Sequence, residues 1–168
     1  MNHRRSLLLL LLALVSTVLA QDVLVINHPA QNEQWSNNRE FPIDYTIVGG
    51  QTTNPPFDAN YPNSLTVYFQ WAKHGDGSNP LRLTAIQSLE TSPYPAGVQN
   101  QQYHQKWKTP NCHFFSRYPP SSYDFSLYFE PSYLPAAPNA TSVSNGPQQQ
   151  PITVNLNIQV SNETFPKC

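Results

Sequence analysis

The sequence has 168 residues and a formal net charge of −1, with 11% charged residues, 12% aromatic residues and 17 prolines. This length fits one domain. The charge is too small and too scattered for a nucleic-acid-binding protein, and the aromatic content argues against a disordered chain. The many prolines argue against long helices.

Residues 1–20 have the order of a secretory signal peptide. Arg4 and Arg5 precede an apolar run over 7–15, and small residues follow up to Ala20. A membrane anchor is the alternative, but the run is shorter than the roughly 20 residues that cross a bilayer. We therefore expect a secreted, extracellular domain at 21–168, with seven basic and ten acidic residues and no membrane anchor.

Apolar and polar residues alternate with a period of two in most of the mature chain, which is typical of strands with one buried face. The segment 81–89 loses this phase at Ala85 and Ile86, which predicts a β-bulge. The segment 102–109 carries lysines and precedes a proline, as edge strands often do. Seven strands are predicted, at 23–26, 41–48, 65–72, 81–89, 102–109, 123–130 and 152–160.

The connections are rich in turn-forming residues. Residues 73–80 contain two glycines and predict a hairpin loop, and 49–63 predicts a longer one. Residues 131–151, rich in Pro, Ser, Asn and Gln, predict a long surface loop. About seven short strands favour an all-β fold, an antiparallel sandwich of two sheets, with a closed barrel as the alternative.

Secretion also sets the expectations for covalent modification. Cys112 and Cys168 are the two cysteines of the chain, and an oxidising route predicts a disulfide between them. Asn139 and Asn162 each begin an Asn-X-Thr sequon and are candidates for N-glycosylation.

No residue pattern predicts catalysis or a cofactor. The histidines lack the spacing of a metal site, so we expect no metal. Asp44, Asp124 and Glu130 fall on the polar phase of predicted strands, where solvated acids are common. No nucleophile or phosphate-loop motif accompanies them. We expect a non-enzyme, and a small glycan-active hydrolase is the alternative.

The aromatic residues give the one hint of a ligand. Tyr103, Trp107 and Tyr118 lie in the predicted edge strand or in a loop, where flat rings can stack on sugars. Trp71 shares its phase with apolar residues and is expected in the core. Tyr103, Trp107 and Tyr118 are therefore candidate glycan contacts.

The N-terminal part of the mature chain carries a family resemblance. An apolar strand at 23–26 leads to Pro29, Trp35 follows six residues later, and an alternating strand begins at Phe41. This order resembles the N-terminal domain of the yeast cell-wall β-1,6-glucan assembly proteins. The resemblance implies an immunoglobulin-like or fibronectin-III-like sandwich in a fungal cell-wall or secretome setting, although Tyr45 stands where a Trp often ends the second strand.

We therefore expect a non-enzymatic secreted or cell-wall-associated protein with weak carbohydrate binding. Its partner would be a cell-wall polysaccharide or an extracellular protein. A protein-binding effector or surface antigen is a further alternative, and the sequence predicts no oligomeric state.

Overall fold

A computed structural model describes residues 22–56, 59–92, 99–133 and 148–161. The predicted signal peptide, most of the predicted loop at 131–151 and the C-terminal segment lie outside these residues. Within them, no helix is long and apolar enough to cross a membrane.

The described residues form eight strands and two short helices, and all seven predicted strands are present. In chain order the elements are β1 (Leu24–His28), β2 (Glu33–Ser36), β3 (Glu40–Ile47), η1 (Gly50–Thr52), β4 (Ser64–Lys73), β5 (Leu81–Leu89), β6 (Gln101–Lys108), α2 (Cys112–Arg117), β7 (Tyr123–Ser132) and β8 (Ile152–Gln159). Neither β2 nor α2 was predicted from the sequence.

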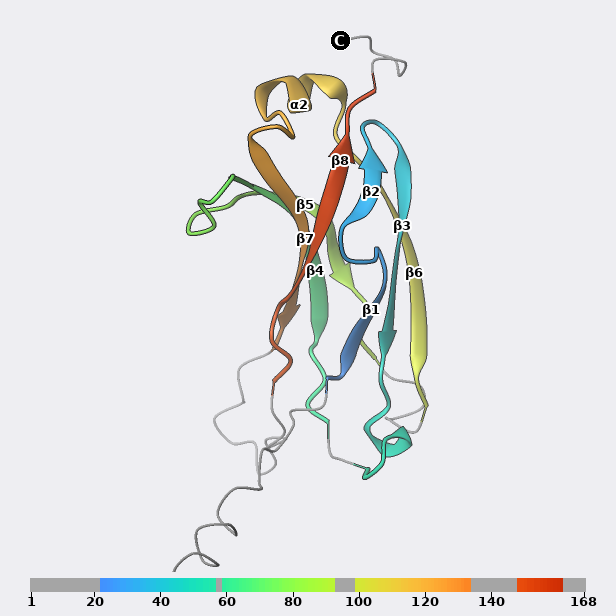
Figure 1. Cartoon of the computed structure of the whole chain (residues 1–168). Coiled ribbons are helices and arrows are strands. Elements are labelled where there is room, and N and C mark those ends of the chain that lie inside the picture. The colour runs from blue at the N-terminus through green and yellow to red at the C-terminus, as the bar shows by residue number, and fades with distance from the viewer. Residues whose placement is uncertain (1–21, 57–58, 93–98, 134–147, 162–168) are drawn as a thin grey trace, which may run out of the picture.

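The strands make two layers (Figure 1). The first sheet has the order β1-β3-β6, and the second has the order β2-β8-β7-β4-β5. The two sheets keep separate strand orders, so the all-β sandwich is confirmed. As predicted, β6 lies at a sheet edge, and the predicted irregularity in β5 is present as register shifts against β4.

One strand pair differs from the predicted antiparallel arrangement. The chain leaves the first sheet after β1, passes through a turn at 29–32 and joins the second sheet as β2 without reversing its direction. As a result β2 pairs with β8 in parallel, whereas all other pairs are antiparallel.

The carboxylate of Glu33 fixes this change of sheet. Its Oε2 accepts a hydrogen bond from the Ala30 amide at 2.8 Å, and its Oε1 accepts one from Trp35 Nε1 at 3.1 Å. His28 Nε2 lies 2.9 Å from the same Oε1. The end of β1, the turn and the start of β2 are thus tied to one side chain.

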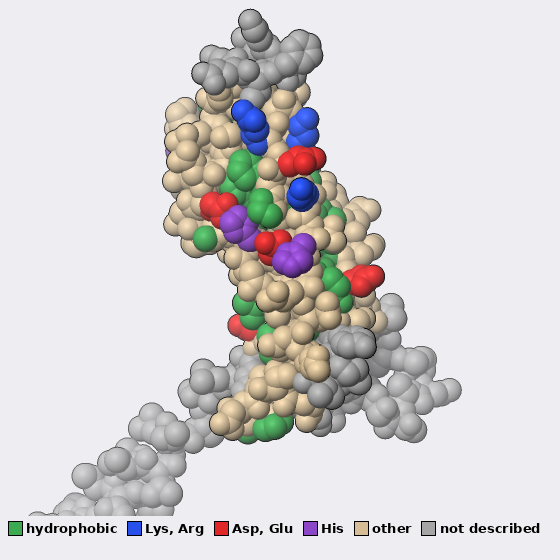
Figure 2. Space-filling view, turned by 90° about the vertical axis from the view of Figure 1, so that its right-hand side faces the viewer, with side chains coloured by type: hydrophobic (Ala, Val, Ile, Leu, Met, Phe, Trp, Pro, Cys, Tyr) green, Lys and Arg blue, Asp and Glu red, His purple; other side chains and the backbone are tan. Residues whose placement is uncertain are grey.

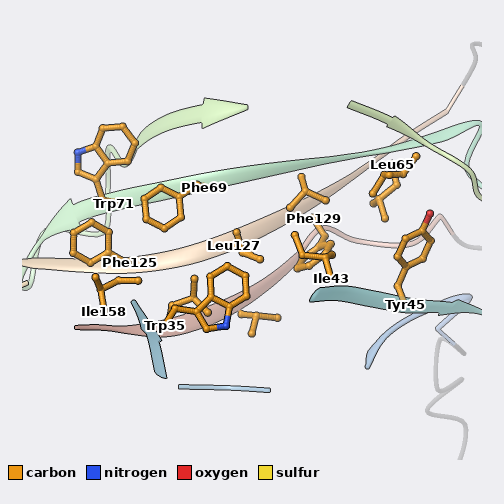
Figure 3. Packing of buried hydrophobic residues seen from close by; sticks show 14 of the residues in the cluster. Trp35, Ile43, Tyr45, Leu65, Phe69, Trp71, Phe125, Leu127, Phe129 and Ile158 are labelled. Atoms are coloured by element: carbon orange, nitrogen blue, oxygen red, sulfur yellow. The ribbon is translucent and has the colours of Figure 1, made fainter. Parts of the chain in front are cut away.

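The core between the sheets combines aromatic and aliphatic side chains (Figure 3). Trp35 is fully buried and stacks on Phe41 with ring centroids 4.6 Å apart. Phe69 and Phe125, on neighbouring strands β4 and β7, stack at 5.6 Å. Full burial of such side chains contributes about 1.5 to 3 kcal/mol each.

The short helix α2 covers one end of the sandwich (Figure 1). The Asn111 side chain accepts a hydrogen bond from the Phe114 amide and caps the helix. Phe115 is buried, and Phe114 makes an edge-to-face contact with Trp71 at 4.8 Å. Six residues are too few to show a helical apolar period, which is why the sequence did not predict this element.

Candidate functional site

Two of the predicted glycan-contact rings, Tyr103 and Trp107 of β6, face the core. Tyr103 stacks on Tyr45 with centroids 5.2 Å apart. The Trp107 ring lies 5.1 Å from Phe69 and 6.2 Å from Trp35. Both rings are half-buried, so each gives part of its surface to the protein interior.

The third predicted ring, Tyr118, follows α2 and is also half-buried. It packs against Trp71 at 5.0 Å, Phe114 at 5.1 Å and Tyr123 at 5.4 Å. The three rings are therefore part of the core periphery, and they do not form one open stacking surface. The exposure predicted for them from the sequence is therefore wrong.

The predicted modification sites are described only in part. Cys112 is buried in the first turn of α2, and Cys168 lies outside the described residues. The disulfide between them stays a prediction. Asn139 and Asn162 also lie outside the described residues.

A different set of side chains gathers on the outer face of the five-stranded sheet, which we call the tyrosine face. Cross-strand register places its central residues in two adjacent rows that run across β8, β7, β4 and β5. The first row is Thr153, Tyr128, Tyr68 and Thr84, and the second is Asn155, Ser126, Gln70 and Arg82.

Strand alternation produces this face. In β4, Leu65, Val67, Phe69 and Trp71 point inward, which leaves Tyr68 and Gln70 on the outer side. The same phase in β7 puts Tyr128 outside. Tyrosines in the polar phase of two clearly alternating strands were thus the signal in the sequence for this face.

An arginine is held over the two tyrosines. The rings of Tyr68 and Tyr128 lie 6.5 Å apart at an interplanar angle of 46°. The Arg82 Cζ atom lies 4.2 Å from the centre of the Tyr128 ring and 5.9 Å from that of Tyr68. Arg82 Nε donates a hydrogen bond to Gln70 Oε1 at 3.1 Å. A cation–π contact and a hydrogen bond together orient the guanidinium group.

The Tyr68 hydroxyl is kept in its neutral form. Desolvation is the largest cause that raises the pKa of this phenol, and the charge and hydrogen bond of Glu130 raise it further, while Arg82 opposes them. Glu130 therefore stands close enough to the Tyr68 phenol to influence its pKa.

A small hollow lies next to the rings, where the second row meets the hairpin between β4 and β5. Its volume is about 160 Å³. Gln70, Ser126 and Asn155 contribute amide and hydroxyl groups to its lining, together with Asp124 and the hairpin residue Gly77. Hydrogen-bonding groups thus adjoin a pair of rings on one rigid sheet.

The hairpin beside the hollow is itself held in place. His74 Nδ1 lies 2.9 Å from Asp124 Oδ1, which links the loop to β7. The Asp76 amide donates to the Lys73 carbonyl at 2.9 Å, and the Ser78 hydroxyl donates to Asp76 Oδ1 at 2.8 Å. The predicted hairpin loop therefore forms an ordered wall of the hollow.

The outer face of the three-stranded sheet, which we call the charged face, has a different character. Figure 2 shows histidines, acids and basic side chains intermixed on this side of the molecule. His104 Nδ1 lies 3.1 Å from Asp44 Oδ1 across β3 and β6. Asp44, His104 and Lys106 line a wide, open hollow of about 550 Å³.

Neither face contains a metal centre that can be recognised in the described residues. His28 and His104 flank Asp44 in the register of β1, β3 and β6. Even so, the described part of the chain has no group of three or more His, Cys, Asp or Glu side chains arranged to hold a metal ion.

Comparison with known proteins does not identify a family for this chain. No family model matches the chain, and no curated protein is similar to it. Among solved structures, a superoxide reductase (neelaredoxin) from Ignicoccus hospitalis has 10% sequence identity and a TM-score of 0.32, with 84% of this chain and 83% of that chain covered. A similarity at this TM-score carries no argument about the function of this chain.

Proposed function

We propose that this protein is a non-enzymatic extracellular or cell-wall-associated β-sandwich that binds carbohydrate weakly on its tyrosine face. One observation carries the proposal: the outward Tyr68 ring, next to the Tyr128 ring that Arg82 covers, lies in the row adjacent to a hollow lined by amide and hydroxyl groups. Rings stack on the apolar faces of sugars, and amides and hydroxyls bond to sugar hydroxyls.

The shape of the face favours an extended ligand. Each row crosses four neighbouring strands and is about 14 Å long, given the usual spacing between strands. The side chains stand on hydrogen-bonded strands, so little backbone freedom is lost when a ligand binds. The open surface and shallow hollow are consistent with weak binding to part of a longer polysaccharide.

The positions of the acids favour binding over hydrolysis. Asp124 and Glu130, which β7 contributes to this face, stand six residues apart, or about 20 Å along a strand. Glycosidases need two carboxyl groups about 5 to 10 Å apart. In addition, Asp124 contacts His74, and Glu130 stands beside the Tyr68 phenol, whose pKa it raises.

We further propose that the sandwich is of the immunoglobulin or fibronectin-III type. The order β1-β3-β6 against β8-β7-β4-β5 supports this class, and so does the passage of the first strand region from one sheet to the other. The resemblance of residues 23–46 to the yeast cell-wall assembly proteins also supports it and agrees with a cell-wall setting.

The proposal can be tested with the purified secreted chain and soluble glucans, mannans, xylans and chitin oligosaccharides, measured by titration calorimetry. The double variant Tyr68→Ala/Tyr128→Ala should weaken binding roughly thirtyfold, which corresponds to about 2 kcal/mol of lost ring contact. Tyr68→Phe/Tyr128→Phe keeps the rings and should retain most of the affinity.

The matched control is the charged face, where Asp44→Ala/His104→Ala should leave binding unchanged. Circular dichroism and thermal melting would show that every variant is folded. Binding that survives loss of both rings would overturn the proposed site, and a wild-type chain that binds none of these glycans would overturn the proposed function.

A further inference from the structure

We infer that the tyrosine face selects acidic glycans, with the carboxylate of a uronic acid received by Arg82. This inference rests on the proposed function and names the class of glycan. It starts from a difference between Arg82 and the other charged side chains of the two outer faces.

The guanidinium of Arg82 is exposed, positive and fixed in place. Gln70 accepts the hydrogen bond of its Nε atom, and the ring of Tyr128 supports its flat surface. Within the described ranges, no salt bridge involves Arg82, since each of the three ion pairs found there joins a histidine to an acid. Its terminal N–H groups therefore remain available to an anion.

The acids of the same face have neighbours of their own. Asp124 Oδ1 lies 2.9 Å from His74 Nδ1, and Glu130 stands beside the Tyr68 phenol, whose pKa it raises. Across the strands Arg82 faces a neutral amide, Gln70, at its register position in β4. On the charged face, by contrast, Lys108 stands opposite Glu40. Lys106 of the charged face stands opposite Pro42, so it too has no acid across its strand pair. What distinguishes Arg82 among the cations of the described residues is the hydrogen bond and the ring contact that orient its charged group.

A planar guanidinium forms paired hydrogen bonds with a carboxylate, which makes arginine a selective receptor for that group. A uronic acid carries its carboxylate on a sugar ring that can stack on an aromatic side chain. Because Arg82 covers Tyr128, we place the sugar ring on Tyr68, whose centre lies 5.9 Å from the Arg82 Cζ atom. Asn155, an exposed amide in the row of Arg82 that lines the hollow, then lies on the side of the sugar hydroxyls.

The test compares the affinity for each acidic glycan with the affinity for its uncharged methyl ester. Oligogalacturonate, alginate and glucuronoxylan oligosaccharides are titrated into the secreted chain, each beside its methyl ester, which keeps the sugar and removes the charge. We expect at least one free acid to bind tenfold or more tightly than its ester. Dextran sulfate, which carries a different anion, should bind more weakly than that acid.

Three variants assign the effect to the arginine. Arg82→Gln should bring the ratio of acid to ester affinity close to one. Arg82→Lys keeps the charge but loses the paired geometry and should lie between the two. Lys106→Gln removes a cation from the charged face and should not change the ratio.

The outcomes separate this inference from the proposed function. Equal affinity for acid and ester in all three pairs would overturn the inference, as would a preference that survives Arg82→Gln or equally strong binding of dextran sulfate. In each of these cases, glycan binding that depends on Tyr68 and Tyr128 would still support the proposed function. Absence of binding to every glycan, charged or neutral, would overturn both.

Discussion

The two outer faces of this sandwich arise from the same alternation of residues but use their polar positions differently. On the charged face, outward residues carry formal charges, and Asp44 meets His104 across neighbouring strands. On the tyrosine face, the outward residues are mainly hydroxyls, amides and rings, with Arg82 near one edge.

The difference matters for what each face can offer to a ligand. Opposite charges that face one another largely cancel, so they leave little net electrostatic potential for a ligand. Exposed ion pairs of this kind also add at most about 1 kcal/mol to stability. Neutral amides and hydroxyls keep both donors and acceptors for a partner. Either composition makes a sheet face soluble, but the neutral one keeps more capacity for specific hydrogen bonds.

The largest effect that we predict lies at the margin of the charged face, where one acid is structural. Glu33→Gln should lower the free energy of unfolding by about 1 to 3 kcal/mol, because buried or charged hydrogen bonds are costly to lose. Glu33 accepts from the Ala30 amide and Trp35 Nε1 and contacts His28, and a neutral amide cannot serve all three. Urea denaturation followed by tryptophan fluorescence measures the change.

Asp44→Asn is the matched comparison, since it removes an acid from a more open pair. The His104 side chain of that pair is 71% exposed, so the expected loss is below about 1 kcal/mol. Equal losses in the two variants would contradict a structural role for Glu33.

The second prediction concerns the amide that orients Arg82. Gln70→Ala removes the acceptor of the Arg82 Nε hydrogen bond at 3.1 Å. A net hydrogen bond contributes about 0.5 to 1.5 kcal/mol, so the affinity for an acidic oligosaccharide should fall roughly two- to tenfold. Gln34→Ala, an exposed amide on β2 outside the two rows, serves as control in the same titration. The role assigned to Gln70 fails if both substitutions have the same effect.

The strand that was not predicted from the sequence, β2, is shorter than the seven strands that were. Seven strands show enough alternation to be recognised in the sequence. The strand β2 has four residues and one fully buried side chain, Trp35, which is too short a pattern to reveal a period. Its parallel pairing with β8 joins segments more than a hundred residues apart, and alternation within one segment carries no information about such a partner.

Prediction of the site from the sequence has the same limit, because alternation within one strand does not identify its neighbours. Trp107 and Tyr103 share one phase of β6, but phase does not tell which side of an edge strand is inner. The register with β3, which sets Trp107 opposite Phe41 and Tyr103 opposite Tyr45, decides that both point to the core. Tyr68 and Tyr128 were recognisable as outward residues, but only the pairing of β4 with β7 brings them together.

The smallest predicted effect is a change in the titration of Tyr68. Glu130→Gln removes a negative charge beside the phenol, so the pKa of Tyr68 should fall toward its ordinary value and remain above it, because desolvation is the larger cause. A raised pKa in the folded state gives a stabilisation that is present below about pH 10 and is lost as the pH rises through the folded value. The variant should therefore lose less stability than the wild type in that alkaline range.

Tyrosinate absorbance during a pH titration, with Tyr68→Phe to identify the signal, measures this shift. Asp124→Asn is a suitable control, because Asp124 lies four residues from Tyr128, the direct partner of Tyr68, and about 13 Å along the strand. It should leave the titration of Tyr68 unchanged. A Tyr68 pKa that does not respond to Glu130→Gln would show that Glu130 is not engaged by the phenol. The acid would then be free to pair with Arg82, which would remove the main difference between the two faces.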